Sequence, residues 1–127
     1  MQEQNRYEYA VIRYVPRVER EEFVNVGLAM MCKRRRWMRV ELHLNENRIK
    51  AMSPDADLEV LARQLQSFVD IAEGKKSAGP VAAYPVEERF RWLSAVKSSV
   101  IQTSRPHPGL CTDLDMTFDS LFCDLVR

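Results

Sequence analysis

Polar residues that bind ligands or transfer protons are concentrated between residues 102 and 111. Gln102, Ser104, His107 and Cys111 stand where we expect a strand to leave a sheet just before a helix N-terminus. That position suits an anion or the backbone of a partner. A cysteine and a histidine can also form a nucleophile and its base, but nothing in the sequence orients Cys111 for that chemistry. A buried Cys111 with a turn-stabilising His107 explains the same residues without chemistry.

A second polar set interrupts segments that otherwise resemble strands. Asn25 and Gly27 stand in mid-strand, where both types are disfavoured, so we expect a bulge or a close approach by a ligand or another backbone. Arg13 breaks an apolar face. Alternation predicts one mixed sheet face, which is either a binding surface or a set of cross-strand ion pairs. Its members are Arg13, Asn25, Arg39, Glu41 and His43.

Residues 33–39 form the most basic stretch of the chain. One interpretation is a hairpin tip that contacts phosphates and stacks its tryptophan on a base. The other interpretation is a solvated turn whose charges protect the sheet from aggregation and whose tryptophan packs on the sheet edge. The residues are Lys33, Arg34, Arg35, Arg36, Trp37 and Arg39.

No motif dedicated to one reaction occurs in the sequence. The P-loop, dinucleotide-binding, zinc-protease and nucleophile-elbow patterns are absent. The histidines, His43 and His107, are far apart, and three cysteines show no CxxC spacing, so we expect no metal. These absences favour a protein without a cofactor or catalytic residues over an enzyme.

Length and composition predict one globular domain over residues 1–127. An apolar share of 46% suffices for a core, and a net charge of +1 argues against disorder. No apolar run reaches the roughly 18–20 residues that span a bilayer, and the polar N-terminus does not resemble a signal peptide. We therefore expect a cytoplasmic protein with free thiols.

Hydrophobic patterning predicts an α+β fold with the order βββ-α-α-β-α. We expect about four strands, at residues 7–15, 23–32, 37–44 and 99–104, in a mainly antiparallel sheet whose one face is covered by helices. Val24, Val26, Leu28, Met30 and Cys32 form one apolar set in the second strand. Pairing it with the apolar set of the third strand requires an odd loop of three or five residues.

Capping residues predict three helices. Ser53 and Pro54 suit a start and Gly74 a stop for the first, Pro85 opens the second, and Thr112 caps the last. Residues 47–52 read as a loop or a single turn, residues 75–80 as a loop, and residues 105–109 as irregular because Pro106 and Pro108 fall within them.

The chain resembles a bacterial family known as domain-of-unknown-function family 3037, from residue 9 to residue 126. One stretch that carries the resemblance is residues 9–16 (YAVIRYVP) with residues 22–27 (EFVNVG). The other comprises residues 79–80 (GP), 88–93 (ERFRWL), 101–104 (IQTS), His107 and 109–111 (GLC). The resemblance implies no reaction. Members are often encoded beside a kinase-like protein similar to the toxin of a persistence system, which implies a kinase-like partner.

We therefore favour a non-enzymatic protein-interaction module over two alternatives. Arg13 and Asn25 would position the partner, Arg89 and Arg91 would pair with its acidic groups, and His107 would form a hydrogen bond with it. The full set of candidate binding residues is Arg13, Asn25, Gly27, Arg89, Arg91, Gln102, Ser104 and His107. One alternative is nucleic-acid binding through the basic stretch, and the other is a small pocket or active site near Arg89, Gln102, His107 and Cys111. Self-association through a sheet edge is also compatible with the sequence.

Overall fold

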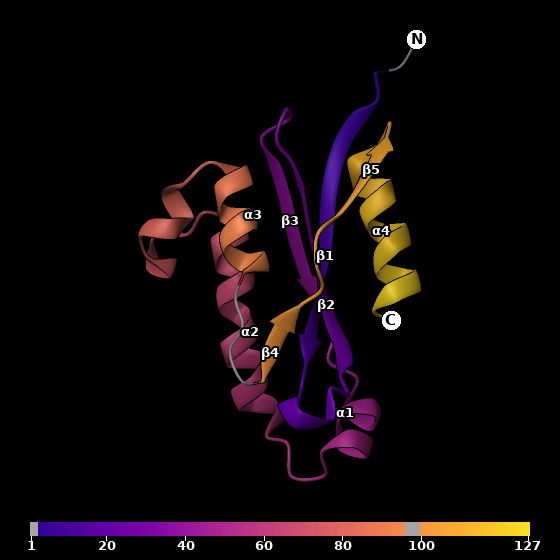
Figure 1. The fold of residues 1–127 in the computed structure, drawn as a ribbon. Coiled ribbons are helices and arrows are strands. Elements are labelled where there is room, and N and C mark those ends of the chain that lie inside the picture. The colour runs from indigo at the N-terminus through magenta and orange to yellow at the C-terminus, as the bar shows by residue number, and fades with distance from the viewer. Residues whose placement is uncertain (1–2, 96–99) are drawn as a thin grey trace.

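A five-stranded antiparallel sheet is the centre of the computed structural model, which describes residues 3–95 and 100–127 (Figure 1). The order is β3 (Trp37–Leu42), β2 (Val24–Cys32) and β1 (Asn5–Tyr14). β4 (Ile101–Thr103) and β5 (His107–Cys111) then pair with opposite ends of β1. The α+β class and the antiparallel sheet are confirmed. Residue 99, the expected start of the fourth strand, lies outside the described residues.

The strand β5 corrects the expectation of irregular structure at residues 105–109. Pro108 lies opposite Glu8 in the β1–β5 register. β5 pairs with β1 at the outer side of the described sheet, where a residue without an N–H group is tolerated. Residues 105 and 106 do lie outside the strands, so the expectation is wrong only for residues 107–109, where Pro108 is part of β5.

Four α-helices and three short 3₁₀ helices connect and cover the described strands. The α-helices are α1 (Glu46–Met52), α2 (Leu58–Ala72), α3 (Val86–Ser94) and α4 (Leu114–Leu125), and the 3₁₀ helices are η1 (Val18–Arg20), η2 (Lys76–Ala78) and η3 (Pro80–Ala83). No helix within the described residues is both long and apolar enough to cross a membrane. The segment expected to be a loop or single turn at residues 47–52 belongs to α1.

Two predicted helix starts were misplaced. The caps of α2 and α4 are aspartates: Asp57 accepts from the amides of Glu59 and Val60, and Asp113 accepts from the amide of Met116. The expected caps were Ser53 and Thr112. In each case the aspartate next to the first helical turn satisfies its free amides.

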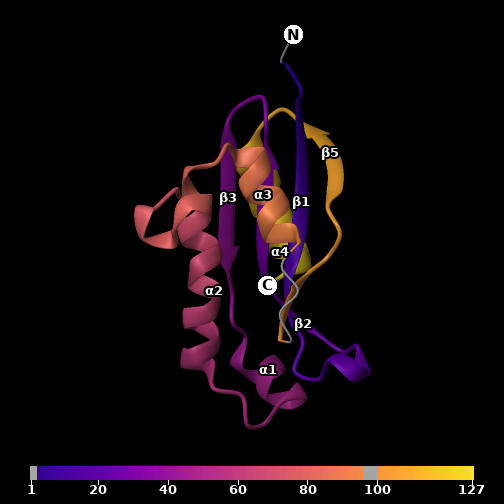
Figure 2. The same cartoon turned by 60° about the vertical axis from the view of Figure 1, so that its left-hand side comes forward.

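Helices lie on both faces of the sheet, not on one as expected (Figures 1 and 2). α2 and α3 cover one face, whose core includes Ile12, Leu65 and Phe90. α4 covers the other through Phe118 and Phe122, which pack with Leu28 and Met30. Both clusters are needed because β2 is apolar on its two faces, and an apolar sheet face must be covered by another element.

A bulge in β2 divides the apolar set that the sequence placed on one face. Ile12 pairs with Gly27 but Arg13 pairs with Asn25, so Val26 is the extra residue. Val24 and Val26 therefore join the core under α2 and α3, whereas Leu28 belongs to the core under α4. The expectation of a bulge near Gly27 is confirmed, and a bulge reverses the side-chain alternation that follows it.

The expected odd loop between β2 and β3 is wrong. Four residues, 33–36, connect the strands, and Met30 lies opposite Arg39 and Cys32 opposite Trp37. Apolar and polar residues can share this face because α4 covers it: the Trp37 ring meets the Phe118 ring edge-on, with centroids 6.5 Å apart. The argument for an odd loop assumed that the face with Trp37 and Arg39 was open to solvent.

Candidate functional site

Three polar residues from distant parts of the sequence form a row across the sheet. Arg13 of β1 lies opposite Asn25 of β2 on one side and opposite Gln102 of β4 on the other. Directly opposed residues in antiparallel strands share a face. The two polar sets found in the sequence therefore meet at this row, on the face that α4 covers further along the sheet.

Arg13 is held by an aromatic ring instead of an acid. Its guanidinium carbon lies 4.0 Å from the centre of the Phe23 ring. Its Nε is buried and has no hydrogen-bond partner among residues 3–95 and 100–127. Burial lowers the pKa of Arg13 from its ordinary value, although a guanidinium stays protonated near neutral pH. Arg13 thus keeps a charge and an unused donor.

A hollow opens on the exposed side of Arg13, next to η1. Two of its apolar residues are strongly exposed: Val18 is 47% and Phe23 41% accessible to solvent. Glu21 has a φ of 55°, and this left-handed residue ends η1 and turns the chain back toward β2. The hollow is lined by Arg13, Val15, Val18, Glu21, Phe23 and Gln102.

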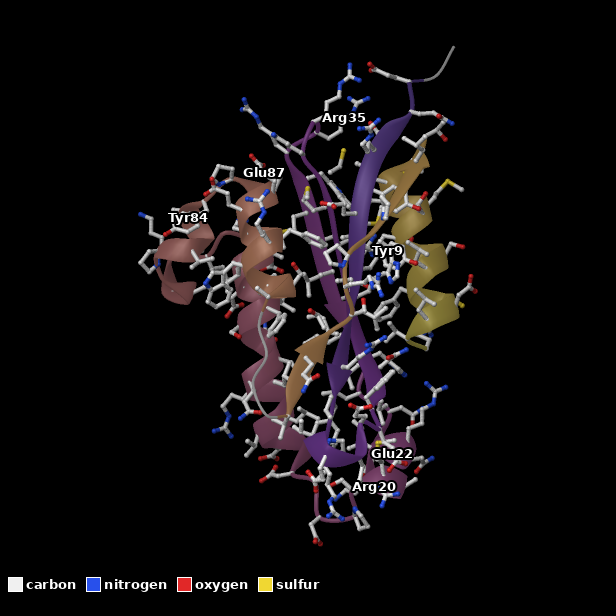
Figure 3. The ribbon with its side chains drawn as sticks, in the orientation of Figure 1. Tyr9, Arg20, Glu22, Arg35, Tyr84 and Glu87 are labelled. Atoms are coloured by element: carbon white, nitrogen blue, oxygen red, sulfur yellow. The ribbon has the colours of Figure 1, made fainter. Side chains whose placement is uncertain are left out.

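Two further hollows lie beside this one and share lining residues with it or with each other, and we call the three together the η1 surface. Phe23 also lines the second hollow, with Val24, Asn25, Arg48, Ala51, Met52 and Leu125. The third contains Pro16, Arg17, Arg20, Glu22 and again Arg48, Ala51 and Met52. The linings hold four arginines and two glutamates, a net charge of +2. Figure 3 shows Arg20 and Glu22 at the end of the molecule where η1 meets α1.

Asn25 joins the η1 surface to the end of α4. Its Nδ2 donates to the carbonyl of Leu125 at 2.9 Å, and its buried Oδ1 has no hydrogen-bond partner. Gly27 is close to a neighbouring strand: a Cβ built there would lie 2.9 Å from Leu42 Cδ2 and 3.0 Å from the Glu41 carbonyl oxygen. Both residues therefore have internal roles, and only Asn25 also lines the η1 surface.

Ser104 lies between β4 and β5 and bonds to β1. Its Oγ accepts from the amide of Val11 at 2.9 Å and donates to the carbonyl of Arg105 at 3.0 Å. The side chain is buried and bonded within the chain. It stabilises β1 at the point where the edge strand changes.

The arginines expected to pair with a partner's acidic groups lie on α3, on the opposite face of the sheet. One Nη of Arg89 donates to the carbonyls of Ile71 and Ala72 and so binds the C-terminus of α2. Arg91 is exposed. Neither residue is near the η1 surface.

His107 and Cys111 belong to one strand and do not meet. They stand four positions apart along the strand, which is roughly 13 Å. The His107 ring lies 5.2 Å from that of Tyr9, the labelled residue beside β5 in Figure 3. Burial, and then Cys111 and Tyr9, raise the pKa of Tyr7. Because Arg89 lies on the other face, the four residues of the expected pocket do not converge.

The basic stretch is divided between an exposed turn and the core. Arg34 and Arg35 contact Glu3, and Arg35 Nε donates to Asn5 Oδ1 at 2.9 Å. Trp37 packs on Phe118. Arg39 also lies over Phe118 and forms ion pairs with Glu41, Asp115 and Asp119 at 2.7–3.1 Å. Burial acts to lower the pKa of Arg39, but the hydrogen bonds and charges of Glu41 and Asp119 raise it overall.

Sequence analysis missed half of the η1 surface. Phe23 was assigned only a strand position, and Val18, Arg17, Arg20 and Arg48 were not considered. The highly charged turn at residues 17–22, followed directly by Phe23, was an available signal. The sequence contains no signal for Arg48, because its position depends on how α1 packs. No group of three His, Cys, Asp or Glu side chains arranged for a metal occurs among the described residues.

Comparison with protein families finds one match, described as a protein of unknown function, DUF3037, over residues 9–126. Searches of curated proteins and of solved structures find no match. The matched region contains β2 to β4, α1 to α4 and the entire η1 surface. The chain is therefore a member of the DUF3037 family.

Proposed function

We propose that this protein is a non-enzymatic interaction module that binds a protein partner through the η1 surface. The observation that carries the proposal is Arg13. It is charged, stacked on an exposed phenylalanine, and lacks an acidic partner for its Nε. An arginine beside exposed apolar side chains in a hollow is the kind of site where a few residues dominate binding.

The chemistry of the surface indicates its partner. Phe23, Val18 and Met52 offer apolar contact. Arg17 and Arg20 are paired with Glu19 and Glu22, so Arg13 and Arg48 are the lining arginines without an ion pair among the described residues. The complementary segment carries an apolar side chain for the Phe23 hollow and a carboxylate for Arg13. The family resemblance implies a kinase-like protein as the partner, and this is the first protein to test.

The other two candidate functions have less support. The expected enzyme pocket would need Arg89, Gln102, His107 and Cys111 to converge, and they lie on two faces of the sheet. Nucleic-acid binding would need a free tryptophan and free cations. Trp37 is instead packed on Phe118, and Arg39 is paired with three carboxylates.

The test is co-expression with a kinase-like protein of the kind often encoded beside genes of this family, followed by affinity measurement. We expect Phe23→Ala and Arg13→Ala each to weaken binding by about tenfold or more, because truncating a central anchor commonly has this effect. Trp92→Ala is the matched control, since Trp92 is exposed to 47% on the opposite face. Undiminished binding by folded Phe23→Ala and Arg13→Ala variants would exclude the η1 surface.

A further inference from the structure

The outer edge of β3 presents backbone groups in a known alternation. His43 donates its amide to the Val26 carbonyl at 2.8 Å, toward β2. Along an antiparallel strand, residues that bond to one neighbour alternate with residues whose N–H and C=O point the other way. Arg39 and Glu41 therefore bond toward β2, and Met38, Val40 and Leu42 direct their backbone groups to the outside. β3 is the end strand of the described sheet.

A hollow runs along this edge, between β3 and α2. Its apolar wall consists of Met38, Val40 and Leu42 from β3 and of Val69 and Ala72 from α2. The same three β3 residues also direct their backbone N–H and C=O groups outward. An extended chain in the hollow could therefore form hydrogen bonds with these groups and pack its apolar side chains on the same residues. This combination is what strand addition to a sheet edge requires.

The charges around the edge are mainly acidic. Glu41 and Glu73 line the hollow with Arg39. Arg39 is already paired with Glu41, Asp115 and Asp119. These three carboxylates around one guanidinium leave a local net charge of −2, whereas Glu73 is paired with Lys75. A chain bound here gains from basic side chains on the face toward α4, next to Glu41.

We propose that the β3–α2 hollow is a strand-addition site for an extended segment of a partner protein that alternates apolar and basic residues. The apolar residues face Val69 and Ala72, and the basic ones face Glu41. A second copy of this chain is a poorer occupant, because its own β3 edge would bring the same excess of carboxylates. The site lies at the opposite edge of the sheet from β4 and does not depend on the η1 surface.

The test uses a synthetic peptide of alternating valine and lysine, as long as β3, added to the full chain. Amide chemical shifts and hydrogen exchange are followed by NMR. We expect the amides of Met38, Val40 and Leu42 to shift and to gain protection, and amides of the η1 surface to be unaffected. A peptide of the same composition with paired valines and paired lysines is the control, because it cannot place all its valines on one face.

Two variants then test the backbone and the charge separately. Met38→Pro removes an outward N–H, and we expect about tenfold weaker peptide binding because the hydrogen bond and its geometry are lost. Glu41→Lys should weaken binding by a similar factor, whereas Glu88→Lys, the same charge change on α3, should not. If Met38→Pro does not fold, Glu41→Lys still decides. The proposal fails if the control peptide binds as well, if Glu41→Lys binds normally, or if the edge instead forms a homodimer on gel filtration.

Discussion

Two arginines on the same sheet face, Arg13 and Arg39, each stack on a phenylalanine but differ in the acidic groups around them. Each guanidinium lies over a phenylalanine, Arg13 at 4.0 Å from Phe23 and Arg39 at 4.2 Å from Phe118. Arg39 has three carboxylates, two of them from α4. The Nε of Arg13 has no hydrogen-bond partner in the described part of the chain.

The end of α4 accounts for the difference. Helix α4 covers the sheet from Trp37 to Asn25, whose side chain bonds to the Leu125 carbonyl in the last turn. Arg13 stands one strand further, where α4 no longer supplies acids or apolar cover. Arg39 therefore has a structural role, and Arg13 is the arginine that a partner can use. The first two tests below compare the region covered by α4 with the open region around Arg13.

The largest expected effect is on the phenylalanines beneath the two guanidinium groups. Phe118 is fully buried, so Phe118→Ala should lower the free energy of unfolding by about 3–5 kcal/mol. Phe23 is 41% exposed, so Phe23→Ala should lower it by less than about 1 kcal/mol. Urea unfolding monitored by circular dichroism measures both. Similar losses for the two variants would mean that Phe23 is a core residue and that the η1 surface is not open.

The same contrast explains which parts of the molecule the sequence could predict. Strands β1 to β3 follow from alternation, and α2 and α3 from amphipathic spacing, because these patterns are local. The placement of α4 is not local. It depends on the bulge at Val26, which reverses the faces of β2. Strict alternation of side chains along a strand does not reveal such an extra residue.

The candidate site was predictable in its strand residues and not in its connections. Arg13, Asn25 and Gln102 stood out because polar residues in apolar strands need a reason. Arg13, Asn25 and Arg39 were assigned to an exposed sheet face, but Asn25 and Arg39 have internal partners. Among the described residues, the buried Nε of Arg13 has no such partner. Arg48 enters the site through α1, a segment interpreted as a loop or a single turn because Asn45 was not recognised as its cap.

A smaller effect is expected from removing each guanidinium. Arg39→Met leaves Glu41, Asp115 and Asp119 without a cation and should lower the free energy of unfolding by about 1 kcal/mol, since the acids are well exposed. Arg13→Met removes a buried donor that has no partner, so stability should change by less than about 0.5 kcal/mol in either direction. The difference between the two variants should shrink in high salt, because screening weakens only the ion pairs.

The salt dependence provides the check on that comparison. If Arg13→Met destabilises as much as Arg39→Met, and the loss also shrinks with salt, then Arg13 has an acidic partner in solution. Arg13 would then be structural as well. Glu21 lines the same hollow, and Glu21→Gln would identify it as that partner by reproducing the loss.

The smallest expected effect concerns the exposed turn at residues 33–36. It is basic like the η1 surface, but it is a convex turn, and Glu3 already contacts two of its arginines. We expect a single-stranded oligonucleotide to bind weakly at low salt and to be released by about 0.2 M salt, because only a few phosphates can be contacted. Fluorescence anisotropy during a salt titration measures this. Glu3→Gln should strengthen the low-salt binding slightly by freeing Arg34. Binding that persists at physiological salt and is lost in Arg36→Ala would instead favour the turn over the η1 surface as the functional region.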